Sequence, residues 1–339
     1  MASRTFRVAI LGATTAAGQE LGTALLERRF PVAELLFFGE GEDVGEVVEV
    51  GDDEYKILAL EKSRLRGVDL AFVPPGAALT KDWLESLQEQ GAVVIDGAGT
   101  AATEDALLVF PGINDEELEE VEGAKGRVFR LPSASAAQLA AVLLPLEARG
   151  GIGRAQVVCL EAVSTAGGIE GMEELSEQTV SLLNGKEPIA EAFPHRIAFN
   201  VIPQVEGFDP SGDTLHERRL VAEVRRLLDK ESLSLSVTSV VVPVFYGAMQ
   251  ILDVSLERAI DPAAARELLR EGELKVIDEP EEGVFPMPML AVGDEAVQVG
   301  RVRASPAGLG LISVADALRW GTVVPMVRLA ELLLEEELF

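Results

Sequence analysis

Residues 6–18 read FRVAILGATTAAG, and a helical pattern follows over Gln19–Arg29. A short apolar run that ends in Gly12 and passes into a helix is typical of the first half of a βαβ unit. Further short apolar runs follow at Leu35–Phe38, Asp69–Val73 and Ala92–Asp96. Because strands and helices alternate, the first 132 residues predict a doubly wound, Rossmann-type α/β domain with a parallel sheet.

The same glycine turn is a candidate nucleotide site. Backbone N–H groups at a helix N-terminus can bind a pyrophosphate when glycine lets it approach closely. The usual middle glycine is replaced by Thr15, whose Cβ would crowd that approach. A strand–turn–helix that keeps only the fold fits the pattern as well. The residues that would contact a cofactor are Gly12, Thr14, Thr15, Ala16, Ala17 and Gly18.

The turn after the second apolar run is acidic and reads FGEGED over residues 38–43. An adenosine 2′-phosphate favours Arg or Lys at this place, whereas a carboxylate repels it or accepts a ribose hydroxyl. The turn therefore favours NAD over NADP, or no nucleotide. An acidic surface turn in an acidic protein is the alternative interpretation.

After Pro132 the pattern changes to longer, valine-rich strands with helices between them. We expect a helix over Ser135–Ala148 and strands over Ala155–Val163, Leu233–Val244, Met249–Leu256 and Ala296–Arg303. Long strands close together in sequence favour a mixed or antiparallel sheet in an α+β domain, here residues 133–314. The terminal segment Val314–Leu338 is rich in Leu and reads as helical.

Composition excludes several functional classes. The chain has 339 residues, 29 Lys and Arg against 57 Asp and Glu, a net charge of −28 and a mean hydropathy of +0.22. This charge argues against binding to nucleic acid or to an anionic membrane. No uncharged stretch is long enough to span a bilayer and no signal peptide precedes Phe6, so we expect a soluble, cytoplasmic protein.

Few residues offer metal or thiol chemistry. Cys159 is the single cysteine and has no neighbouring base in the sequence, so we expect it to be buried and structural. His195 and His216 are the two histidines, and with one cysteine they give no zinc-binding spacing. We expect no metal site, and surface or packing roles for both histidines.

The motifs together identify a family. The chain resembles aspartate-semialdehyde dehydrogenase along nearly its whole length. The landmarks that carry the resemblance are GATTAAG (12–18), VVIDGAG (93–99), LVFPGIN (108–114), PSASAAQL (132–139), VSTAGGIEG (163–171), IAFNVIP (197–203), VTSVVVPVFYG (237–247), VGRVR (299–303) and ADALRWG (315–321).

That resemblance implies an NADP-dependent reductive dephosphorylation of aspartyl phosphate in amino-acid biosynthesis, which proceeds through a thioester. The chemistry needs a Cys nucleophile, a Gln that orients the intermediate, an Arg that clamps the substrate carboxylate and a His acid/base. At the matching positions this chain has, in the same order, Ala134, Gly167, Val241 and Ala248. All four catalytic side chains are missing.

Ligand positions are also changed. The family's phosphate-binding Arg corresponds to Ala102, and the basic residue for the 2′-phosphate corresponds to Glu42. The positions that retain a polar side chain include Asn114, Gln138, Asn200, Glu217 (where the family binds the substrate ammonium group) and Arg219. With these losses the chain looks most like the Usg paralogue of the family, which lacks the catalytic cysteine.

Two functions follow as expectations. The first is a catalytically degenerate homodimer that associates through the second domain and keeps at most a vestigial nucleotide or metabolite pocket, in which NAD or NADP is possible. As the resemblance implies, its terminal segment 315–339 returns to complete the first domain. The alternative is an active NAD(P)-dependent oxidoreductase with relocated chemistry at Ser133, Ser135 or Ser164. A serine hydroxyl needs an adjacent base, and the family's base position is Ala248.

Overall fold

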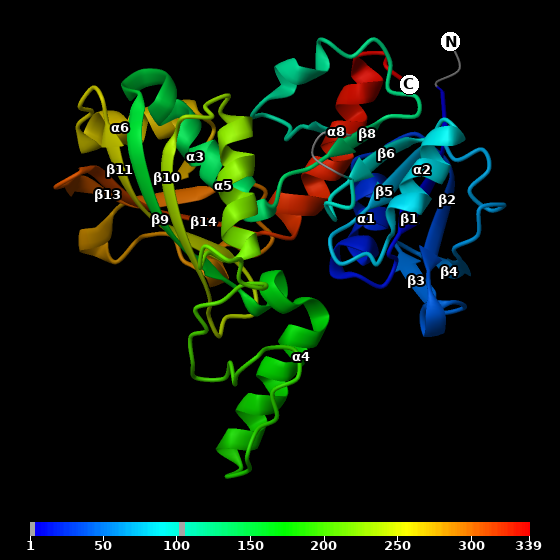
Figure 1. Ribbon diagram of the computed structural model, residues 1–339, viewed down its shortest axis with the longest axis horizontal. Coiled ribbons are helices and arrows are strands. Elements are labelled where there is room, and N and C mark those ends of the chain that lie inside the picture. Colours follow the sequence, from blue (N-terminus) through cyan, green and yellow to red (C-terminus); the bar gives the residue numbers. More distant parts are fainter. Residues whose placement is uncertain (1–3, 102–105) are drawn as a thin grey trace. The chain divides into compact units, whose positions relative to one another are not determined.

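A computed structural model describes residues 4–101 and 106–339 (Figure 1). The chain divides into two compact units. Unit 1 comprises Met1–Pro132 and Thr322–Phe339, and unit 2 comprises Ser133–Gly321. The expected point of return, Ala315, is the last residue of a strand in unit 2, and the chain re-enters unit 1 at Thr322.

Unit 1 is built on an eight-stranded sheet in the order β3-β4-β2-β1-β5-β6-β8-β7. Every recorded pairing is parallel except that of β3 with β4. The strands are β1 (Phe6–Leu11), β2 (Val32–Gly39), β3 (Val47–Val50), β4 (Asp53–Ala59), β5 (Leu70–Val73), β6 (Val93–Asp96), β7 (Leu107–Leu108) and β8 (Val128–Arg130). Every residue of β5 and β6 is buried, as expected for a parallel sheet that is covered on both faces.

The helices of unit 1 are α1 (Ala16–Glu27), α2 (Lys81–Glu89) and α8 (Val324–Glu335), with 3₁₀ turns η1 (Gly41–Asp43) and η2 (Asp115–Leu118). Helix α8, red in Figure 1, packs against α1 and β6, and its buried residues include Met326, Leu329 and Leu333. Arg28 adds a two-pronged ion pair to Glu331, with N···O distances of 2.9 and 2.7 Å. The Rossmann-type domain and the return of the C-terminal helix are thus confirmed.

Unit 2 contains a six-stranded mixed sheet in the order β10-β9-β11-β14-β13-β12. The strands are β9 (Ile152–Glu161), β10 (Ser234–Val241), β11 (Ala248–Leu256), β12 (Lys275–Val276), β13 (Gln298–Ser305) and β14 (Gly308–Ala315). The helices and turns are α3 (Ala134–Gly150), α4 (Val163–Leu183), α5 (Leu215–Leu227), α6 (Pro262–Glu271), α7 (Pro288–Ala291) and the 3₁₀ turn η3 (Pro280–Glu282). The π-helical turn η4 (Arg319–Val323) begins in unit 2 and ends in unit 1. The predicted α+β architecture is confirmed.

The sheet of unit 2 is covered by helices on one face. Helices α3, α5 and α6 pack there over a core that includes Ala155, Val157 and Cys159, which alternate along β9. On the other face, the residues between them are more accessible, and an apolar patch crosses neighbouring strands. We call it the sheet patch; it consists of Val158, Leu160, Val240, Met249, Ile251 and Ile312.

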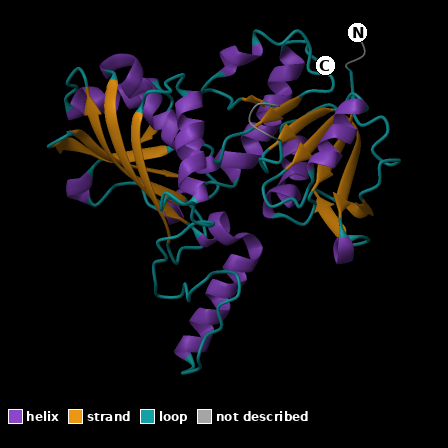
Figure 2. Cartoon of the chain, viewed as in Figure 1, coloured by secondary structure: helices purple, strands orange, loops and turns teal. Residues whose placement is uncertain are grey.

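Helix α4 projects away from this sheet, and a long loop returns along it (Figures 1 and 2). The helix is kinked at Gly168, whose φ of 60° and ψ of −147° are not helical. Among the described residues, no helix is long and apolar enough to cross a membrane.

Candidate functional site

The positions that the resemblance makes catalytic all lie in unit 2, and several meet at one end of its sheet. Val241 is the last residue of β10 and pairs with Glu161, the last residue of β9. Ala248 opens β11, and the next residue, Met249, pairs with Leu160. The ends of three adjacent strands therefore place these positions around Glu161.

Two hydrogen bonds fix the start of α3 at this end of the sheet. Ser135 Oγ donates to Glu161 Oε1 at 2.7 Å, and Gln250 Nε2 on β11 donates to the Ser135 carbonyl at 2.7 Å. Ala134, the position of the missing nucleophile, opens the same helix turn. A Cβ on Gly321 would lie only 2.4 Å from the Ala134 Cβ, so a glycine there allows the two segments to approach. The structure thus brings positions 134, 241 and 248 together.

Gly167, in the place of the family's Gln, lies on α4 under an aromatic ring. A Cβ on Gly167 would lie 2.7 Å from Phe193 Cζ, and one on Gly171 would lie 3.0 Å from the same atom. Phe193 is 7% exposed and belongs to a hydrophobic cluster with Val163, Leu175, Ile197, Ala198, Ile202, Val205 and Val241. The positions of the missing Gln and Arg therefore contribute to hydrophobic packing.

A buried polar cluster lies beside these positions. Glu161 is 1% exposed, and His216 Nε2 is 3.4 Å from its Oε1 without hydrogen-bond geometry. Within the described residues, Glu161 Oε2, His216 Nε2 and Ser239 Oγ have no hydrogen-bond partner. Glu161 is not predictable as a site residue from the sequence, where the only signal is a carboxylate that closes a valine-rich strand.

The serine hydroxyls beside this cluster bond to carboxylates. The Ser135 hydroxyl is bonded to a carboxylate rather than to an imidazole, and Ser135 itself is 2% exposed. Ser133 donates through both N and Oγ to Glu223 Oε2, at 2.9 and 2.7 Å. A catalytic serine needs a base that can take its proton and a path for substrate.

The two histidines and the cysteine have separate environments. His216 is buried, His195 is exposed, and Cys159 is buried in the core of unit 2. Burial raises the pKa of the Cys159 thiol well above its usual value, and the negative charge of Glu161 raises it further. The prediction that Cys159 is buried is confirmed.

The polar positions that survive are engaged with their own chain. Glu217 Oε2 accepts from Thr214 N at 2.7 Å, and Glu217 Oε1 accepts from Ser239 N at 2.8 Å, so both of its oxygens serve the cap of α5 and strand β10. Arg219 pairs with Glu206 at 2.6 Å. In unit 1, Asn114 accepts from Phe110 N and donates to the Leu108 carbonyl, both at 2.9 Å.

The glycine turn of unit 1 requires glycine at two positions. Gly12 has φ of +108°, and a Cβ on Gly18 would lie 2.0 Å from the Gly12 carbonyl oxygen, so both positions require glycine. Thr15 Oγ1 donates to that carbonyl and accepts from Gly18 N, at 2.9 and 3.0 Å. Its hydroxyl is therefore used as the N-cap of α1. Ala16 and Ala17 are the first residues of the helix. The main-chain N–H groups of a first helical turn have no acceptor within the helix. N–H groups in this position can bind an anion such as a phosphate.

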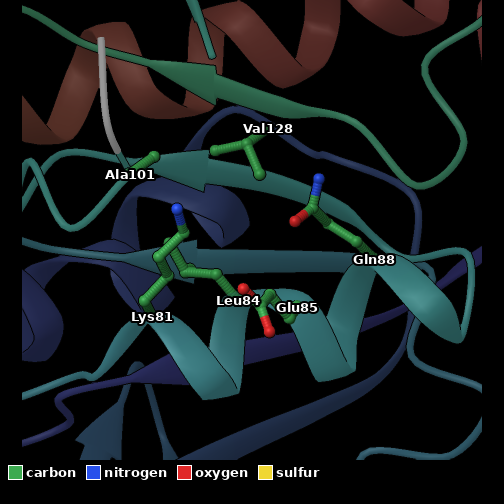
Figure 3. A pocket seen from close by; sticks show the side chains of 6 residues that line it. All are labelled: Lys81, Leu84, Glu85, Gln88, Ala101 and Val128. Carbon is green, nitrogen blue, oxygen red and sulfur yellow. The ribbon is translucent and has the colours of Figure 1, made fainter. Parts of the chain in front are cut away.

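A separate cavity of about 260 Å³ lies in unit 1 beside helix α2 (Figure 3). Its lining consists of Lys81, Leu84, Glu85, Gln88, Ala101 and Val128. None of the candidate site residues named above lines it. Ala102, the position of the family's phosphate-binding Arg, falls outside the described residues. In residues 4–101 and 106–339, no three His, Cys, Asp or Glu side chains gather as metal ligands.

Comparison with known protein families matches both units. The model of the semialdehyde dehydrogenase NAD binding domain matches residues 7–121, and that of the semialdehyde dehydrogenase dimerisation domain matches residues 143–320. The match to an NAD binding domain makes nucleotide binding possible for unit 1.

Relatives match over nearly the full chain. Aspartate-semialdehyde dehydrogenase of Aquifex aeolicus is 36% identical, covering 98% of this chain and 99% of that protein. A USG-1 protein homolog of Azotobacter vinelandii is 33% identical, covering 97% and 98%. The crystal structure of aspartate semialdehyde dehydrogenase II from Vibrio cholerae complexed with ASA superposes with a TM-score of 0.91 at 32% identity, covering 98% and 99%.

Proposed function

The chain belongs to the aspartate-semialdehyde dehydrogenase family, and we propose that it is a catalytically degenerate member that acts as a homodimer. The packing of Phe193 onto Gly167 carries this proposal. A site that had lost only its nucleophile would still have space for the other catalytic side chains, including the Gln. Here an aromatic ring takes the place where the Gln side chain would begin.

The other replaced positions support the same conclusion. Ala134 has no atom that can add to a carbonyl, and Ala248 has none that can accept a proton. Val241 lies in the hydrophobic cluster of Phe193, where a guanidinium group would be buried at a large desolvation cost. The covalent path is therefore removed along with the groups that would assist it.

A relocated serine is the second candidate, and the hydrogen bonds of the site disfavour it. Ser133 and Ser135 both donate to carboxylates, and Ser135 is buried. Ser164, at the start of α4, has its main-chain N–H bonded to the Phe245 carbonyl. A seryl route would need an imidazole beside one of these hydroxyls.

The homodimer part of the proposal rests on unit 2. The matching family model is described as a dimerisation domain, and the sheet patch leaves Val158 39% and Ile251 38% exposed. Apolar residues that are contiguous across strands normally mark an interface. Unit 1 contributes at most a vestigial nucleotide pocket at the glycine turn.

Turnover measurements test the loss of activity. With aspartate semialdehyde, phosphate and either NADP or NAD, we expect no reduction of nicotinamide above the blank. General acid–base assistance alone is typically worth about 10²–10⁴-fold in rate, and the covalent path is also lost.

The single reversion Ala134→Cys should be equally inactive, because Gly167, Val241 and Ala248 still leave the thiol without its base and the substrate without its clamp. The chain should be purified from an expression host that lacks its own aspartate-semialdehyde dehydrogenase. Turnover by that preparation would overturn the proposal. Turnover by the reverted variant would show a latent rather than a degenerate site.

A further inference from the structure

The turn that follows β2 lies against the glycine turn that follows β1. The two strands are parallel, with Leu11 beside Phe38, so both turns leave the same edge of the sheet. Thr14 Oγ1 donates to Asp43 Oδ2 at 2.8 Å and ties the turns together. Gly39 makes this possible, because a Cβ there would lie 3.1 Å from the Asp43 Cβ.

This contact holds a carboxylate where a Rossmann-type domain places the adenosine ribose. In such domains an acidic residue about 20 positions beyond the glycine turn accepts a hydrogen bond from the ribose 2′-hydroxyl. Asp43 follows the glycine turn at a comparable distance along the chain and is half-buried. Within the described residues, its Oδ1 has no recorded hydrogen bond, whereas Oδ2 is occupied by Thr14. One carboxylate oxygen remains to accept from a ribose.

The charge around Asp43 disfavours a phosphate at the same position. Glu40 and Glu42 belong to the same turn and are exposed. Glu42 occupies the position where the resemblance implies a basic residue that binds the 2′-phosphate. Lys56 on β4 lies near Gly45, beyond this turn, with its Cε 3.7 Å from the Cβ position of that glycine. A 2′-phosphate would carry its charge into contact with the Asp43 carboxylate, at a range where salt screens little.

From these contacts we propose that the glycine-turn site accepts adenine nucleotides with a free 2′-hydroxyl and rejects those with a 2′-phosphate, and that Asp43 makes the distinction. The proposal rests on the nucleotide pocket of the proposed function. It separates this chain from the NADP specificity that the family resemblance implies.

Calorimetric titration of the full chain with NAD⁺ and with NADP⁺ tests this directly, because the two ligands differ by one phosphate group. We expect NAD⁺ to bind at least tenfold more tightly. In Asp43→Asn, which keeps one acceptor oxygen, replaces the other with an amide N–H donor and removes the charge, NADP⁺ affinity should rise and the ratio should fall to about threefold or less. Glu46→Gln, an exposed acid beyond the turn, should leave the ratio unchanged.

Several outcomes would overturn the proposal. If the unmodified chain binds NADP⁺ as tightly as NAD⁺, the proposal is wrong. This result does not depend on whether Asp43→Asn folds. An unchanged ratio in a folded Asp43→Asn variant would remove Asp43 from its role. No heat from either ligand at millimolar concentration would reject both this site and the vestigial pocket, and would leave the non-catalytic dimer intact. Turnover of aspartate semialdehyde, in contrast, would refute the proposed function and not this specificity.

Discussion

Phe193 Cζ lies 2.7 Å from the point where a Cβ on Gly167 would stand. The ring occupies the space in which the family's glutamine side chain would begin, and it also covers Gly171 on the next turn of α4. Both glycines and the ring belong to the packing that holds α4 against the loop that follows it. The absence of the glutamine is thus part of how this segment folds.

This packing predicts that the family's glutamine is not tolerated at position 167. Gly167→Gln should lower the free energy of unfolding by about 1–3 kcal/mol, because inserting atoms into a packed region forces neighbouring side chains to move. Chemical denaturation measures the change. Glu170→Gln, on an exposed position of the same helix, is the matched control and should alter stability by less than about 0.5 kcal/mol.

A double-mutant cycle with Phe193→Ala sharpens that prediction. Removing the ring leaves a cavity that an inserted glutamine can partly fill, so the double variant should be more stable than the sum of the single changes predicts. Strict additivity would mean that the ring and position 167 do not compete for space.

We expect the Cys159 thiol to be unreactive in the folded protein. Burial raises the pKa of its thiol well above the usual value, which disfavours the reactive thiolate. A disulfide reagent that reports thiols by absorbance should therefore find none in native buffer and one per chain in denaturant. Complete reaction within minutes in native buffer would contradict the burial of β9.

The sheet patch predicts how the proposed dimer can be broken. Ile251 pairs with Val158 on one side and Ile312 on the other, which places it within the patch. Ile251→Asp should weaken association by about 2–5 kcal/mol, because a carboxylate would be buried without a partner. Analytical ultracentrifugation at micromolar concentration should then show monomer. Val47→Asp, at a 53% exposed position of β3 in unit 1, should leave the dimer unchanged.

Local patterns predicted the fold where the deciding contacts are local. The run from Phe6 to Gly18 contains a buried strand, its turn and its helix cap, and each is visible in a few consecutive residues. The interpretation of Val314–Leu338 as one helix was wrong at its start. Ala315 ends β14 because it pairs with Ala248 from a distant strand, and helix α8 begins only at Val324.

In the candidate site, too, the sequence predicts the residue types but not the contacts between distant segments. The missing catalytic side chains were visible as residue types, but the ring that replaces one of them was not, because Phe193 reaches Gly167 from a loop beyond α4. The burial of Glu161 and His216 depends on helices α3 and α5 packing on the sheet, which no local pattern specifies. Glu217 illustrates the converse: its residue type suggested a ligand, whereas its oxygens bond to Thr214 and Ser239.

The most direct test of the central claim is the mass of the intact chain after it is mixed with aspartate semialdehyde and NADP without phosphate. An active family member would oxidise the bound aldehyde to an acyl thioester and, with no phosphate to discharge it, would retain the aspartyl group. Because Ala134 offers no nucleophile, we predict an unchanged mass for every chain in the sample. A mass increase of one aspartyl group, lost again when phosphate is added, would contradict the account and would show that this chain still forms the covalent intermediate.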